Sequence, residues 1–462
     1  MPINRREFLA SAAAPLLAPR RPNIIFILVD DLGYGDLGVT GNRDVPTPRM
    51  DSIGREGVRF SQFYCAAPVC SPSRVGFTTG QCPSRHLINT YLNSRKIDRE
   101  NGMRDWLDPA APCIARAFRD AGYATGHFGK WHMGGGRDVG DAPLPQEYGF
   151  QTSWTSFEGL GDRVLIEKDN LSKQSAALDR GKIQWAPKHE LTSMYIDRML
   201  EFMRAHRNDP FYIHLWPCDI HDPYIPRPEL MEKYKRFAAN PYQQKFNAVL
   251  DELDRQVGRV LDAVDSLGLA EHTMIVLTGD NGPTAWPYYY NEGFTPPGST
   301  GGFRGRKWSL YEGGTREPLL VRWKGTVPAG VVDEHTIVDA VDMFPTWCAM
   351  AGVKPPRADF DGEDLSAAFR GKPKQRTKPL YWEYGRNDSY QKPGLKEDQS
   401  PNVAVRDGRW KLLINADGSQ RELYDFDASQ LERDNVAGKH TDVARRLSES
   451  ALRWRRSLPE LS

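Results

Sequence analysis

Several short runs of apolar residues along the chain lack the alternation that a half-exposed strand would show. The first covers residues 23–29 and reads NIIFILV. An unbroken apolar run of this length indicates a strand buried on both faces, as strands of a parallel sheet are. Similar runs recur at 123–128, 211–216, 274–278 and 319–323.

Amphipathic helical patterns lie between these runs. In the clearest, at 242–267, apolar residues form one stripe at helical spacing. The stripe consists of Phe246, Val249, Leu250, Leu253, Val257, Val260, Leu261, Val264 and Leu267. Further helices are expected at 111–121, 191–206 and 339–351. This alternation of buried strands and helices predicts an α/β fold with a doubly wound, mostly parallel central sheet flanked by helices.

The pattern changes after about residue 355. Pro355-Pro356 and the polar stretch 371–378 are typical of a linker. Beyond it the pattern predicts a hairpin with strands at 403–406 and 409–414 around Asp407-Gly408, a strand at 422–426 and a helix at 443–454. We therefore expect a main domain at 21–355 and a small α+β subdomain with an antiparallel sheet at 375–462.

Composition excludes some classes of protein. The chain has 61 Lys and Arg against 60 Asp and Glu, a net charge of +1, which argues against a general nucleic-acid-binding or acidic-membrane surface. No run of 18 apolar residues is present, so no transmembrane helix is expected. The six cysteines include no CxxC pair, and a core of this size needs no covalent staples, so we expect few or no disulfides.

The first twenty residues differ from the rest of the chain. They contain Arg5-Arg6, then Phe8-Leu9, then a short stretch of small and apolar residues up to Ala18. This order resembles a twin-arginine export signal. We therefore expect residues 1–20 to direct export to the periplasm; the alternative is an unstructured start of the chain.

Polar and ionisable residues follow four of the predicted strands. In strand order they are Asp30-Asp31, Lys130 and His132, His221, and Asp280-Asn281. Open parallel sheets bind ligands outside the carboxyl ends of their strands. We therefore expect these residues, which are far apart in the sequence, to meet at one edge of the sheet.

Four of these residues offer only oxygen ligands: Asp30, Asp31, Asp280 and Asn281. Such a set favours a hard cation, calcium or magnesium, over zinc. Because neighbouring residues in a strand point to opposite faces, Asp30 and Asp31 can share an ion only if the strand has ended before them. The alternative for each pair taken alone is a strand-end turn or a helix cap.

The segment from Cys70 to Arg74, which reads CSPSR, suits a loop that turns into a helix. A nucleophile at the start of this helix lies in a field that favours an anion. Arg74 adds a charge with forked donor geometry and is a candidate catalytic residue. The simpler alternative is a capped helix beside a buried thiol. His127 and His214 lie inside predicted strands and are expected to be core residues.

The pattern Cys-x-Pro-Ser-Arg at Cys70, followed by Thr79-Gly80, resembles the motif of the type I sulfatases, arylsulfatase-like enzymes of the alkaline-phosphatase-like superfamily. The resemblance covers roughly residues 22–350, with its blocks in the family's order. The other blocks are Asn23 to Asp31, Gly129-Lys130-Trp131-His132, His221-Asp222-Pro223, Gly279-Asp280-Asn281-Gly282, and Lys307 with Tyr311 to Arg316. The predicted hairpin resembles the family's C-terminal subdomain more weakly.

The resemblance implies that a formylglycine-generating enzyme oxidises Cys70 to formylglycine. One hydroxyl of the hydrated aldehyde attacks the sulfur of a sulfate ester and expels the alcohol, and the second then collapses to the aldehyde and expels sulfate. The resemblance also implies one calcium ion, held by the four oxygen-bearing residues and an oxygen at position 70. The chemistry of the residues alone leaves calcium and magnesium open.

Three further residues add positive charge to the same edge. Lys130, His132 and Lys307 can stabilise the charge that develops as the S–O bond breaks. Lys307 is assigned in preference to Arg306 because its spacing to Glu312 matches the family. An isolated lysine is otherwise read as a solvated surface group.

The match at His221 implies contact with the sulfate and the leaving oxygen, and we expect His221 to be the general acid for the leaving alcohol. The predicted function is hydrolysis of sulfate monoesters, with a sulfated sugar as substrate and simple aryl sulfates as artificial ones. One alternative is a phosphodiesterase or phosphonate monoester hydrolase of the same superfamily. Another is a non-catalytic calcium- and glycan-binding protein.

Two stretches are expected to set substrate specificity. Residues 150–164 and 286–294 both combine aromatic and charged side chains. Aromatic faces beside charged groups suit carbohydrate rings. The alternative is that these aromatic residues only close loops over the core.

Overall fold

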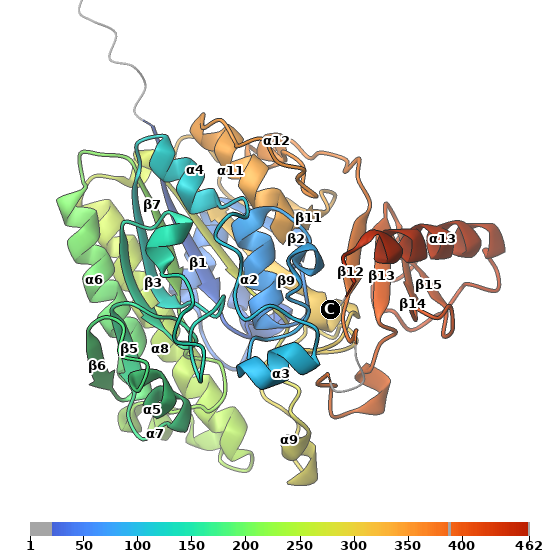
Figure 1. The fold of residues 1–462 in the computed structure, drawn as a ribbon, viewed down its shortest axis with the longest axis horizontal. Helices are drawn as coiled ribbons and strands as arrows, with labels where there is room; N and C mark the ends of the chain where they lie inside the picture. Colours follow the sequence, from blue (N-terminus) through green and yellow to red (C-terminus); the bar gives the residue numbers. More distant parts are fainter. Residues whose placement is uncertain (1–20, 387–389, 461–462) are drawn as a thin grey trace, which may run out of the picture.

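The structure is a computed structural model that describes residues 21–386 and 390–460. Within them, a large central sheet lies between two layers of helices, and a smaller sheet lies at the side (Figure 1). This architecture confirms the predicted fold class. The predicted export signal, residues 1–20, lies outside the described residues. Among the described helices, none is long and apolar enough to cross a membrane.

The central sheet has eleven strands within the described residues. In spatial order, ten of them are β10 (Val331–Asp333), β2 (Val58–Tyr64), β9 (Arg316–Arg322), β8 (Thr273–Gly279), β1 (Asn23–Val29), β7 (Phe211–Trp216), β3 (Ala124–Lys130), β4 (Thr152–Ser156), β5 (Arg163–Ile166) and β6 (Ile183–Ala186). The remaining strand, β11 (Val338–Asp339), pairs with β2. Neighbouring strands are parallel, except that β9 runs antiparallel to both β8 and β2.

The helices cover both faces of this sheet. One face carries α2 (Cys70–Thr79), α4 (Ile114–Asp120), α11 (Met343–Ala351) and α12 (Ser366–Phe369), and the other carries α1 (Pro48–Arg55), α6 (Leu191–Ala205) and α8 (Pro241–Ser266). Strand β1 serves both layers: Ile24, Phe26 and Leu28 belong to the first hydrophobic cluster, and Ile25, Ile27 and Val29 to the second. This two-sided burial is why its sequence is apolar without alternation.

Short helices lie in the connections. They are α3 (Arg95–Glu100), α5 (Asn170–Ala176), α7 (Pro228–Lys233), α9 (Pro287–Asn291) and α10 (Glu312–Thr315). Several of them border the site described below. They have too few residues to be stable alone, so their conformation depends on the tertiary contacts around them.

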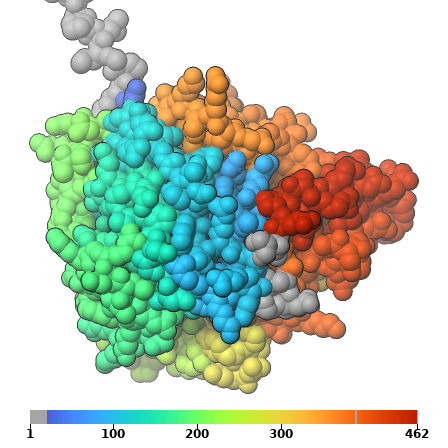
Figure 2. All heavy atoms as spheres, in the orientation of Figure 1, coloured from blue at the N-terminus to red at the C-terminus, as the bar shows by residue number. Residues whose placement is uncertain are grey.

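The smaller sheet is antiparallel and is formed by the C-terminal part of the chain (Figure 1, orange to red). In the space-filling view this part of the chain projects at one side of the molecule (Figure 2, orange to red). Its strands lie in the order β12 (Leu380–Glu383), β13 (Val403–Asp407), β14 (Trp410–Ile414) and β15 (Glu422–Asp425), and α13 (Thr441–Ser457) packs on them. Asp407 pairs with Trp410, so the hairpin tip is Gly408-Arg409, one residue later than predicted. Gly408 takes the left-handed conformation there, with φ of +57°.

The long periodic elements match their predictions closely, whereas the sequence did not predict β2, β4, β5, β6, β10, β11 and β12. The predicted helix at 339–351 is shorter, because β11 ends at Asp339 and the α-helix begins only at Met343. The predicted strand at 319–323 begins three residues earlier, as β9. The stretch predicted as a linker packs on the main body, where Arg376 forms a buried ion pair with Asp342.

Candidate active site

Four adjacent parallel strands bring the candidate residues together. The strands are β8, β1, β7 and β3, in that spatial order. Asp280-Asn281, Asp30-Asp31, His221 and Lys130 lie at or just beyond their carboxyl ends. The convergence predicted from the sequence is therefore present. Lys307 also reaches this edge, from the loop that precedes β9.

The turn at the end of β1 directs two neighbouring carboxylates into one site. The strand ends at Val29, and Asp31 has a left-handed backbone with φ of +59°. Asp30 Oδ2 lies 2.6 Å from Lys130 Nζ, and Asp31 Oδ1 lies 2.6 Å from Lys307 Nζ. The strand thus ends before the two aspartates, as it must if both are to face one ion. The left-handed backbone of Asp31 is uncommon for a residue other than glycine.

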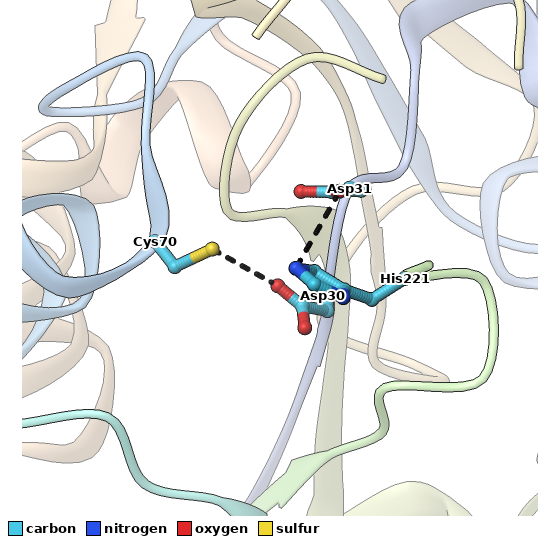
Figure 3. A group of neighbouring side chains, drawn as sticks. All are labelled: Asp30, Asp31, Cys70 and His221. Atoms are coloured by element: carbon cyan, nitrogen blue, oxygen red, sulfur yellow. Dashed lines mark hydrogen bonds and ion pairs between the residues drawn. The ribbon is translucent and has the colours of Figure 1, made fainter. Parts of the chain in front are cut away.

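Cys70 is the first residue of α2 and points at the carboxylates (Figure 3). Its Sγ lies 3.4 Å from Asp30 Oδ1 and 3.5 Å from Lys307 Nζ. Burial, and then the charge of Asp30, raise the pKa of the Cys70 thiol to about 12. The thiol is therefore neutral at ordinary pH and is a poor nucleophile as it stands.

Arg74, one helical turn after Cys70, lies behind the carboxylates. Its guanidinium donates to Asp280 Oδ2 from Nε at 3.0 Å and from Nη2 at 2.7 Å, and Nη2 lies 3.3 Å from Asp30 Oδ1. The side chain is fully buried and stacks over Trp216. Arg74 therefore holds the acidic residues in place and does not line the open cavity.

The donor set fits a hard divalent cation. Ligand atoms of Asp30, Asp31, Cys70 and His221 all lie within 4.8 Å of one another. Asn281 Nδ2 donates to Asp31 Oδ1 at 2.7 Å, while its Oδ1 is buried without a hydrogen-bond partner. Buried carbonyl oxygens are rarely left unpaired, and calcium or magnesium would satisfy this one together with the carboxylates.

The pKa values of the two buried carboxyls, Asp30 and Asp280, are shifted in opposite directions. Burial raises the pKa of Asp30, but Lys130 and then His221 and Arg74 outweigh it and hold that pKa well below its usual value. Burial and the nearby charge of Asp30 raise the pKa of Asp280 to about 7. This is the pattern of like charges crowded at low dielectric, which a divalent cation would relieve.

His221 presents one ring nitrogen to the site. Its Nδ1 lies 2.6 Å from the carbonyl oxygen of Asp222, which fixes Nδ1 as the donor, and Nε2 lies 3.9 Å from Asp31 Oδ2 (Figure 3). Lys188 Nζ holds this segment by donating to the carbonyl oxygens of His221 and Pro223. Burial lowers the pKa of His221 to about 4.

Sequence reasoning missed Lys188, and it did not assign a role to Asp222. The carboxylate of Asp222 accepts hydrogen bonds from the hydroxyls of Tyr288 and Tyr289. Those tyrosines come from the stretch predicted to set specificity, and here they hold the loop of His221. The only available cue was that Asp222 follows His221 in a matching block.

His132 lies two residues beyond the end of β3 in a left-handed conformation, with φ of +53°. Its Nε2 is 3.4 Å from the carbonyl oxygen of Leu92, and its Nδ1 is buried without a partner. Phe157 packs edge-on against the ring at 5.0 Å and also lies 5.0 Å from Lys130 Nζ. His127 and His214, by contrast, are core residues packed around Trp216, as predicted.

Six of the predicted site residues line one cavity of about 360 Å³. Its polar end contains Asp30, Cys70, Lys130, His132, His221 and Lys307. Its walls include Tyr91, Asn93, Arg137, Phe157, Glu158, Trp286 and Trp308. Both stretches predicted to set specificity thus reach the cavity, whereas Tyr91, Asn93 and Arg137 were not anticipated. An acid- and cation-lined end beside a largely apolar chamber suits an anionic ester with an organic group attached.

Comparison with known families agrees with this geometry. The model of the sulfatase family matches residues 22–353, and the model described as N-sulphoglucosamine sulphohydrolase, C-terminal, matches residues 300–456. The first match includes every candidate residue of the site.

Individual proteins give the same result. The chain is 31% identical to arylsulfatase A of Homo sapiens over 90% of this chain and 79% of that protein. It is 26% identical to N-acetylgalactosamine-6-O-sulfatase of Bacteroides thetaiotaomicron over 93% and 92%. The crystal structure of Ps i-CgsB superposes with a TM-score of 0.78 at 25% identity, covering 96% of this chain and 94% of that one. The chain therefore belongs to the sulfatase family, whose members hydrolyse sulfate esters.

Proposed function

We propose that this sulfatase removes sulfate from a sulfated carbohydrate, with an aldehyde made from Cys70 as the source of the nucleophile and a calcium ion as the metal. The observation that carries the proposal is that Cys70, two lysines and four oxygen-bearing residues contact one another at the polar end of one cavity. The similarity to N-acetylgalactosamine-6-O-sulfatase, whose name states a sulfated sugar, supports this substrate class.

The position of Cys70 supports its conversion to formylglycine. Its Sγ lies within 3.5 Å of both Asp30 and Lys307, so an oxygen at this position would meet the same two groups. Its raised thiol pKa makes the unmodified side chain unsuited to attack. When present, the hydrated aldehyde supplies one hydroxyl for attack and a second for release of sulfate.

Asp30, Asp31, Asp280 and Asn281 would hold the cation. The unpaired Oδ1 of Asn281 and the crowded carboxylates support an ion there. When bound, calcium supplies positive charge next to the reacting sulfate. The choice of calcium over magnesium rests on the family resemblance, and both fit an all-oxygen set.

The charged residues of the cavity have separate tasks. Lys130 and Lys307 line the polar end, where their ammonium groups can stabilise negative charge on sulfate oxygens. His221, held at Nδ1 by the Asp222 carbonyl, directs Nε2 toward the site and can give a proton to the leaving alcohol. An anionic substrate favours its protonated form. His132, braced by Phe157, supports the nucleophile and the sulfate charge.

Maturation, export and domain division complete the proposal. A formylglycine-generating enzyme would modify Cys70, and residues 1–20 would act as a twin-arginine signal that delivers the protein to the periplasm. The catalytic domain would span residues 21–355 and the C-terminal subdomain 375–462. The four-stranded sheet from β12 to β15 supports this division.

The test is sulfate release from defined sulfated mono- and disaccharides, with mass spectrometry of the peptide that contains Cys70. We expect turnover of at least one sulfated sugar and an aldehyde at position 70 in the active protein. Preferred turnover of phosphate diesters or phosphonate monoesters would instead support the alternative hydrolase. Full activity from protein with an intact Cys70 thiol would contradict the mechanism, and glycan binding without any turnover of modified protein would support the non-catalytic alternative.

A further inference from the structure

Two loops beyond β3 and β4 run side by side along the active-site cavity. The two strands are parallel neighbours, with Lys130 paired to Ser156 at their ends. Beyond them the backbone N–H of Trp131 donates to the carbonyl of Ser156, and the N–H of His132 donates to that of Phe157, both at 3.3 Å. These loops thus contribute residues both to the polar end of the cavity and to its wall.

Each loop places one charged residue on that wall, and the two residues form an ion pair. Arg137 Nε donates to Glu158 Oε1 at 2.9 Å, and both residues line the cavity. The Glu158 side chain is 4% exposed and that of Arg137 is 20% exposed. Because the Glu158 carboxylate is nearly buried, its position is set by the fold and not by solvent.

The backbone around this pair is held in uncommon conformations. Arg137 and Glu158 both have positive φ, of +51° and +54°. Gly136 provides the room for the carboxylate, because an added Cβ there would lie 2.1 Å from Glu158 Oε2. Non-glycine residues hold such conformations only where the surroundings enforce them, and they concentrate at functional sites.

The pair has hydrogen-bonding capacity left over. Within residues 21–386 and 390–460, the Arg137 Nη groups and Glu158 Oε2 form no hydrogen bond to another residue. The wall therefore offers fixed donors beside a fixed acceptor. Burial raises the pKa of Glu158 to about 7, although Arg137 lowers it. Above neutral pH the two charges of the pair therefore offset each other, and the pair gives no excess positive charge for a second anionic group on the substrate.

We propose that Arg137 and Glu158 bind two neighbouring hydroxyls on the sugar ring that carries the sulfate. The guanidinium donates to one hydroxyl oxygen, and the carboxylate accepts from the other hydroxyl. The pair lies next to the sulfate end, because Phe157, the residue before Glu158, packs on Lys130 and His132. This specificity role rests on the proposed carbohydrate function, and an aryl sulfate has no hydroxyls to use it.

The test compares substrates with and without the hydroxyls. The substrates are the sulfated monosaccharide that the wild-type enzyme turns over fastest, its deoxy analogues, and 4-nitrophenyl sulfate. Arg137→Ala and Glu158→Gln should lower kcat/KM for the sugar roughly 10- to 100-fold, as expected for lost hydrogen bonds to charged groups. Turnover of 4-nitrophenyl sulfate should stay within about threefold of wild type, since the sulfate end is untouched.

Two further variants separate recognition from folding. Gly136→Ala displaces the Glu158 carboxylate while keeping every charge, so it should also slow the sugar selectively. Arg227→Ala is the matched control: Arg227 pairs with Glu252 with side chains 24% and 5% exposed, and neither residue lines this cavity. Arg227→Ala should leave kcat/KM unchanged for both the sugar and 4-nitrophenyl sulfate. With the wild type, the deoxy analogue that lacks the contacted hydroxyl should show the same loss of kcat/KM as the variants show with the parent sugar. With the variants, the deoxy analogue should react no more slowly than the parent sugar.

The outcomes separate a failure of this inference from a failure of the proposed carbohydrate function. Equal losses on the sugar and on 4-nitrophenyl sulfate, or deoxy analogues that react as fast as the parent sugar, would overturn the hydroxyl-binding role alone. Turnover of 4-nitrophenyl sulfate with no turnover of any sulfated mono- or disaccharide would overturn the carbohydrate proposal and this subsite together.

Discussion

A buried charge network joins the C-terminal sheet to the loop that carries Lys307. Lys411 on β14 lies 2.8 Å from Glu312 Oε1 and 2.9 Å from Glu432 Oε1, and all three side chains are inaccessible to solvent. Glu312 follows Lys307 by five residues, and its other oxygen accepts from Tyr64 at 2.8 Å. The network therefore stabilises both the junction and the active-site loop.

Substituting Lys411→Met keeps the length of this side chain and removes its charge. Glu312 retains Arg316, whose Nη1 lies 3.2 Å from its Oε2, but Glu432 loses its one ion-pair partner among the described residues. Removing one partner of a buried pair costs about 3–5 kcal/mol. We expect a loss of about 3 kcal/mol at neutral pH, near the low end, because Glu432 can take up a proton.

The same substitution should change the dependence of stability on pH. Burial already raises the pKa of Glu432 to about 7, with Lys411 lowering it and Glu312 raising it. Without Lys411 the folded-state pKa rises further above its unfolded value. A raised carboxyl pKa stabilises the fold at low pH, and this contribution is lost as pH rises through the folded pKa. The deficit of Lys411→Met should therefore be smaller near pH 5.5 than near pH 7.5.

The measurement is the free energy of unfolding in urea at both pH values, for wild type, Lys411→Met, Glu432→Gln and the double variant. The double variant should lose less than the sum of the single losses, because the two residues share one interaction. Arg446→Met is the control, since its pair with Asp407 is exposed and should be worth at most about 1 kcal/mol. A Lys411→Met loss below about 1 kcal/mol, with the pH dependence of wild type, would refute the reasoning.

Three further predictions concern catalysis, the metal and export. His221→Ala should slow a sulfated sugar about 10²- to 10⁴-fold in kcat/KM but an activated aryl sulfate far less, because a sugar alkoxide needs a proton as it leaves and a nitrophenolate does not; His132→Ala should lack this selectivity, and equal losses for His221→Ala would leave it as a sulfate-binding residue. Asp280→Ala should lose at least about 100-fold in activity with a native circular dichroism spectrum, and exhaustive chelation should abolish activity that calcium restores; stoichiometric zinc in the active protein, or full turnover without metal, would contradict the assignment. Replacing Arg5 and Arg6 together by lysine should leave the precursor in the cytoplasm, as cell fractionation would show, and normal export of that variant would rule out the twin-arginine signal.

Local pattern was sufficient for the elements whose burial is simple. The run at β1 is apolar because both faces of the strand are covered, and α8 has one continuous apolar stripe along Pro241–Ser266. In both, each residue's environment follows from its place in a repeat. The short strands β4 and β6 were not predicted, because their pairing depends on a neighbour and not on their own sequence.

The approximate position of the site also followed from the sequence. Asp30, Lys130, His221 and Asp280 come at or just past strand ends, and parallel strands place such ends at one edge of a sheet. This rule needs only strand order along the chain and common direction. It does not depend on which strands are neighbours, so the sequence is enough to apply it.

Tertiary structure alone decided how those residues are held and what surrounds them. Arg74 stands in the cysteine motif, yet its contacts are Asp280 and Asp30 behind the cavity. Arg137 and Glu158 meet across 21 residues because two irregular loops follow parallel paths, and their positive φ angles have no signature in the residue types. Contacts between loops depend on the path of the backbone through space, which no periodicity in the chain encodes.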